Sequence, residues 1–149
     1  VCSSDLSIVF FRRSDVISTG NIFTPNRYPV IDTERGGTVK GLVGALNKVL
    51  ELAVPEAFSE GGTKIVPARG RISEETDVAE FRDMVAIIRD RVQDGINKKQ
   101  TLDQIKASRP TRDYDPEYGS QAEGERLVEA MYKTLVPPPA PAPARRGGR

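Results

Sequence analysis

Short apolar runs separated by turn residues dominate the first part of the chain. Three runs rich in β-branched or aromatic residues predict strands at residues 7–12, 15–19 and 63–66. Arg13 and Ser14 form a tight connection between the first two runs, and a glycine pair at residues 61–62 precedes the third. The pattern therefore predicts a β-hairpin and one later, separate strand.

Four other segments repeat apolar residues at helical spacing. Thr38 is a favourable N-cap for the first, which Pro55 ends, and Ser73 is expected to cap the second. The second segment carries an apolar stripe opposite a charged face, formed by Val78, Phe81, Val85, Ile88 and Val92. Residues 101–104 have capping-box form, and a last helix is expected around residues 127–135.

In chain order these segments are two strands, a helix, a strand and three further helices. A length of 149 residues is that of one domain. Three strands are too few for a complete doubly wound sheet. The order therefore favours an α/β fold that corresponds to one half of a layered domain, with about three strands and four helices.

Composition excludes several functions for this chain. A net charge of +1 and the absence of tryptophan argue against nucleic acid and anionic membranes as partners. No apolar run approaches the roughly 20 residues of a membrane span. With no histidine and one cysteine, the chain alone supplies neither an ordinary zinc site, nor a histidine general base, nor an intrachain disulfide.

The two ends differ in composition from the middle. Residues 1–6, VCSSDL, match the translation of a common short-read sequencing adapter, so we expect the native reading frame to begin upstream of Ser7. Residues 137–149 contain five prolines and three arginines and predict an extended, disordered tail. The domain is therefore expected to span residues 7–136.

Several motifs within that span resemble the metallo-β-lactamase-fold hydrolases, most closely their glyoxalase-II-like bacterial branch. They are VISTGNIF (16–23), RYPVID (27–32), the GG-x-V helix start (36–39), VPARGR (66–71) and RDMVAIIRDRVQD (82–94). The resemblance covers residues 7–135 and implies the second half of an αββα sandwich of two sheets with helices outside. The N-terminal half of the domain, with its H-x-H-x-D-H motif, would then be missing. Many relatives of this branch are exported, whereas the sequence itself leaves the compartment open.

The resemblance also implies a metal site with one or two ions, usually zinc, that activate a hydroxide to attack an ester, thioester or related bond. The chain departs from the family at both ligand positions that it contains. Asn21 stands where the family has the Asp of T-G-D, and Arg69 stands where it has the His of P-G-H-G. We therefore expect this chain alone to hold no metal and to be inactive.

Two hypotheses about function follow. The chain is a fragment of such a hydrolase with a degenerate metal site, or it is a non-enzymatic descendant in which Arg69 and Arg71 attract a small anionic ligand. Pairing of Arg69 with a carboxylate such as Asp32 or Glu74 is an equally simple interpretation. Magnesium held by Asp15 and Asp32 has no supporting motif, and an unrelated α/β interaction domain would not explain the several shared motifs.

Overall fold

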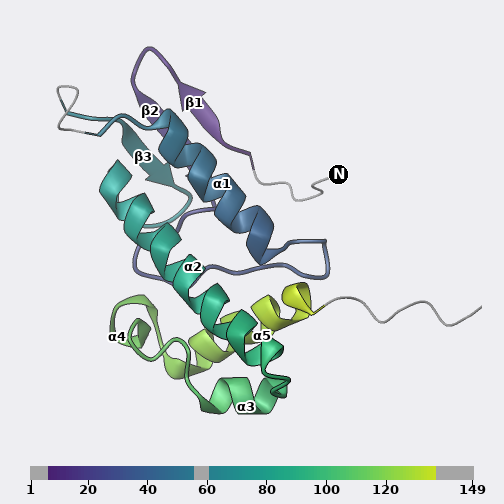
Figure 1. Cartoon of the computed structure of the whole chain (residues 1–149). Coiled ribbons are helices and arrows are strands. Elements are labelled where there is room, and N and C mark those ends of the chain that lie inside the picture. Colours follow the sequence, from purple (N-terminus) through teal and green to yellow (C-terminus); the bar gives the residue numbers. More distant parts are fainter. Residues whose placement is uncertain (1–6, 56–60, 137–149) are drawn as a thin grey trace, which may run out of the picture.

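A computed structural model describes residues 7–55 and 61–136 of the chain (Figure 1). It contains a three-stranded sheet and five helices. The elements are β1 (Val9–Phe11), β2 (Val16–Gly20), α1 (Val39–Leu52), β3 (Lys64–Pro67), α2 (Glu75–Asn97), α3 (Leu102–Ala107), α4 (Asp115–Tyr118) and α5 (Gln121–Leu135). The α/β class and the three strands are confirmed, whereas the predicted segments 1–6 and 137–149 lie outside the described residues.

The sheet is mixed, in the order β1-β2-β3. β1 and β2 pair antiparallel as the predicted hairpin, with Phe10 opposite Ile17. β2 and β3 pair parallel, with Ile17 opposite Ile65, and α1 lies in the crossover that a parallel pair requires. The free side of β3 is partly covered, because Ile65 and Ser73 exchange backbone hydrogen bonds of 2.8 and 2.9 Å.

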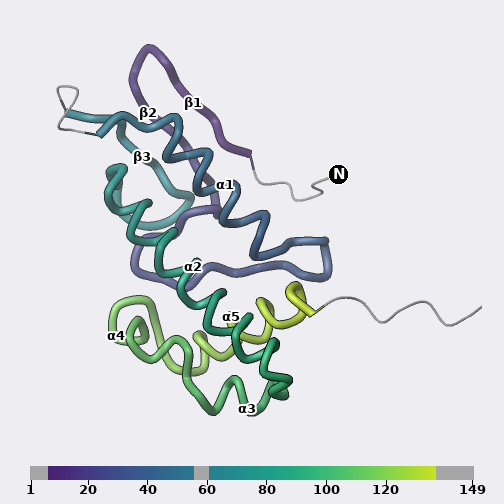
Figure 2. The backbone as a smooth tube through the Cα atoms, in the orientation of Figure 1, coloured from purple at the N-terminus to yellow at the C-terminus, as the bar shows by residue number. Residues whose placement is uncertain are grey.

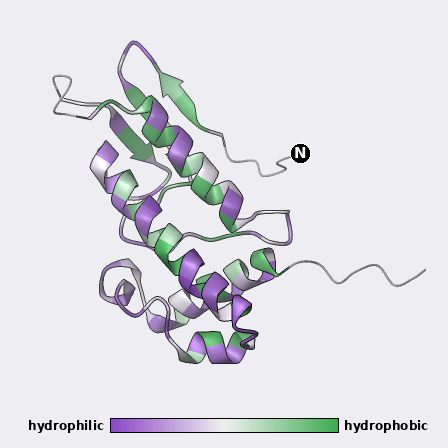
Figure 3. Cartoon of the chain, viewed as in Figure 1, coloured by the Kyte–Doolittle hydropathy of each residue, from purple (hydrophilic) through white to green (hydrophobic). Residues whose placement is uncertain are grey.

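One face of the sheet belongs to the hydrophobic core. Ile17 and Ile65 are fully buried there with Leu46 of α1 and Val85 of α2. The whole predicted stripe of α2 is buried, and Figure 3 shows green apolar bands along α1 and α2 between purple polar ones. α5 packs against α2 and adds Met131 to the same core.

The opposite face of the sheet is open. Side chains that are paired across strands share a face, which places Val9, Phe11, Val16 and Val66 together on this side with the polar Ser18 and Lys64. Val9 is 46% exposed and Phe11 is 53% exposed. β1 is therefore apolar on both faces, as its uniform green in Figure 3 shows, although only one face meets the core.

Helix starts were predicted with mixed success. Thr38 caps α1 as predicted, since its hydroxyl accepts from the amide of Gly41 at 3.0 Å, and the capping box of α3 is also confirmed. The prediction that Ser73 caps α2 was wrong. Its backbone is held in the bridge to Ile65, so Glu74 becomes the N-cap and Asp77 completes the box.

The short helix α4 was not predicted. A single four-residue turn with a proline near its start has no apolar period to detect. The expected four helices are therefore five. Among the described residues, no helix combines the length and the apolar character needed to cross a bilayer.

The core can be tested at two adjacent isoleucines of α2. Ile88 is fully buried, whereas Ile87 is 41% exposed. We expect Ile88→Ala to lower the free energy of unfolding by about 2–5 kcal/mol through lost burial and the cavity left behind. Ile87→Ala, the matched control, should change it by less than about 0.5 kcal/mol. Equal losses in urea denaturation would contradict this placement of α2.

Candidate functional site

The loops that follow β2 and β3 meet at one edge of the sheet. Because these strands are parallel, both loops leave from their carboxyl ends, with Gly20 opposite Pro67. The amide of Ala68 donates to the carbonyl of Gly20 at 2.9 Å and ties the two loops together. Asn21 follows β2 directly, and Arg69 lies two residues beyond β3. Ligand sites in open α/β sheets are found outside this edge.

Two glycines fix the backbone of these loops. Gly20 has a φ of +55° and Gly70 a φ of +108°, values that other residues rarely adopt. A Cβ atom on Gly70 would lie 2.7 Å from Cγ of Pro25, which belongs to the loop after β2. The two loops therefore pack closely only because residue 70 has no side chain.

The side chains of Asn21 and Arg69 point away from the core and are exposed. Neither forms a side-chain hydrogen bond or ion pair with any other residue in the described ranges. The two carboxylates considered as partners for Arg69 pair elsewhere: Asp32 with Arg35 at 3.5 Å, and Glu74 with Lys64 at 3.0 Å. The structure therefore does not support simple charge pairing of Arg69 with either of them.

Arg71, the other predicted anion-binding residue, is already engaged. Its two terminal nitrogens donate to Asp77 at 3.0 and 2.6 Å in a bidentate pair. These hydrogen bonds raise the pKa of Arg71 and lower the pKa of Asp77. Asp77 also accepts from the amide of Glu74 at the start of α2. Arg71 thus anchors the loop to the helix, and of these two arginines only Arg69 has a guanidinium without a partner among the described residues.

The described residues offer no alternative metal site. Oδ1 of Asp15 accepts from the hydroxyl of Thr63 at 2.9 Å, while Asp32 accepts from the amide of Arg35 within its own turn. Within residues 7–55 and 61–136, no three side chains of the types His, Cys, Asp or Glu are grouped so that they could hold a metal ion. The structure therefore does not bring Asp15 and Asp32 together as ligands.

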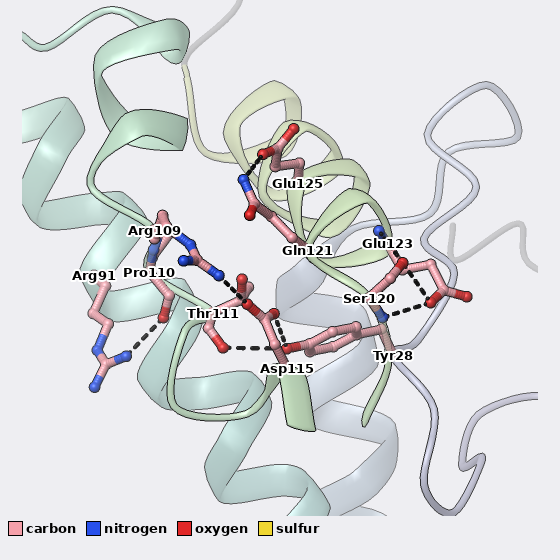
Figure 4. Close-up of polar contacts among 10 residues, drawn as sticks. All are labelled: Tyr28, Arg91, Arg109, Pro110, Thr111, Asp115, Ser120, Gln121, Glu123 and Glu125. Atoms are coloured by element: carbon pink, nitrogen blue, oxygen red, sulfur yellow. Dashed lines mark hydrogen bonds and ion pairs between the residues drawn. The ribbon is translucent and has the colours of Figure 1, made fainter. Parts of the chain in front are cut away.

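A buried polar network holds the loop that starts at Asn21. Figure 2 shows this loop crossing between the sheet and the C-terminal helices before α1 begins. The hydroxyl of Tyr28 donates to Oδ1 of Asp115 at 2.8 Å and lies 3.3 Å from the carbonyl oxygen of Thr111 (Figure 4). Arg109 donates to the other oxygen of Asp115 at 3.1 Å. The network connects the loop that follows β2, from here on called the site loop, to α4.

Aromatic rings continue the same connection. Phe23 meets Phe81 of α2 edge to face, with ring centroids 5.3 Å apart. The ring centroid of Tyr118 lies 6.1 Å from that of Phe81 and 6.0 Å from that of Tyr28. Sequence reasoning missed this group and the Tyr28 network. The only available signal was the density of Asp and Tyr at residues 113–118.

No protein-family model matches this chain, and no curated protein matches it. Function is therefore inferred from the residue patterns and from the geometry.

The Tyr28 network can be tested by removing one hydroxyl. Tyr28→Phe leaves the ring in place but takes the donor from Asp115, so we expect a loss of about 1–2 kcal/mol in the free energy of unfolding. Tyr132→Phe is the control, since the Tyr132 hydroxyl has no hydrogen-bond partner among the described residues. If both variants unfold at the wild-type urea midpoint, the network does not stabilise the loop.

Alkaline pH provides a second test. Burial, followed by the negative charge of Glu117, raises the pKa of Tyr118 to about 12, and burial together with Asp115 also raises the pKa of Tyr28. A tyrosine whose folded pKa exceeds its ordinary value of about 10 stabilises the fold below that pH and loses this contribution as pH rises.

We therefore expect the free energy of unfolding to fall between about pH 10 and 12, and to fall less steeply in Tyr118→Phe. Lysines also titrate in this window. The test therefore compares how steeply the free energy of unfolding falls with pH in wild type and in the variant, measured by urea denaturation at each pH. Parallel slopes would contradict the prediction.

Proposed function

We propose that this chain is the second half of a metallo-β-lactamase-type hydrolase domain whose own metal-ligand positions have degenerated. One observation carries the proposal: the two loops that contain the ligand positions, with Asn21 and Arg69, meet at the carboxyl edge of adjacent parallel strands. The glycines that shape these loops are present, and the two ligand side chains are replaced.

The open face of the sheet supports a missing partner. Val9 and Phe11 form an apolar surface opposite the helix-covered face, and two packed sheets bury such faces against each other. We propose that the N-terminal half of the same domain covers this surface. That half would also bring the H-x-H-x-D-H ligands to the carboxyl edge.

The residues present do not fit zinc. Asn21 offers a neutral oxygen in place of a carboxylate, and Arg69 has no lone pair to donate. Two unit charges 4 Å apart repel by about 4 kcal/mol at an effective dielectric of 20, so a dication beside a guanidinium meets about twice that. An arginine that turns into solvent meets less repulsion, but it still leaves the ligand position empty. We therefore assign no hydrolytic step to this chain.

A second function is favoured by Arg69 itself. Arg69 is exposed and has no carboxylate partner within the described residues. A descendant that binds a ligand without catalysis would use this arginine to hold a small carboxylate or phosphate. Inorganic phosphate is the probe. A rise in melting temperature that is lost in Arg69→Ala and kept in Arg12→Ala, another exposed arginine, would favour this function.

The degenerate-site proposal is tested by metal binding of the full chain. We expect zinc neither to raise the melting temperature nor to remain bound after dialysis. The double variant Asn21→Asp/Arg69→His regains two ligands and should bind zinc at least about tenfold more tightly, as expected when ligand chemistry is restored. Arg71→His places an imidazole in the same loop at a position that is not a ligand, and is the matched control. Stoichiometric zinc in wild type would refute the proposal.

The source locus separates the two functions. Sequencing upstream of the Ser7 codon, and through codons 21 and 69, should show an open frame that encodes H-x-H-x-D-H if the chain is part of a hydrolase domain. An open frame that lacks those residues would instead favour the binding protein.

A further inference from the structure

We draw no further inference here: the strongest candidate, the free outer edge of β1 beside the open apolar face of the sheet, belongs to the surface already proposed to meet the missing N-terminal half, and nothing in the residues that the structure describes shows what else would cover it.

Discussion

The parallel pairing of β2 with β3 is the constraint on which the rest of the molecule depends. It requires a crossover, which α1 provides, and it makes both strand-end loops leave the sheet at the same edge. The hydrogen bond from Ala68 to Gly20 then fixes how closely the loops approach. If β3 were antiparallel to β2, Asn21 and Arg69 would lie at opposite edges and no common site would exist.

Backbone and side chains at this edge follow different constraints. Gly70 must remain glycine, because a Cβ atom would collide with Pro25, and Gly20 adopts a left-handed conformation. Asn21 and Arg69 are exposed and are held by no contact that the fold requires. The loop architecture is therefore protected by packing, whereas the side chains at positions 21 and 69 can change without disturbing the fold. This separation is what the proposed degeneration requires.

Much of this fold was predictable from local patterns. The apolar stripe of α2 and the cap at Thr38 depend on spacing and on one side chain, and both were confirmed. Ser73 was misassigned because its competing role, a bridge to Ile65, involves residues that only the folded sheet brings together. The Tyr28–Asp115 contact joins positions 87 residues apart, so no local pattern could reveal it. At the site, the positions of Asn21 and Arg69 came from the resemblance, and their contacts came only from the structure.

Tyr118 ties the loop after β2 to the helices through its ring and its backbone. Its ring packs against Phe81 and Tyr28 and its carbonyl accepts from the amide of Tyr28, so ring and backbone hold the site loop against the helices. None of these contacts uses the hydroxyl. A phenylalanine would satisfy them all, so the contribution of Tyr118 to holding the loop comes from its ring and its backbone. The hydroxyl of Tyr28, which donates to Asp115, is the polar side-chain atom on which this attachment depends, and the aromatic rings supply the rest of the contact.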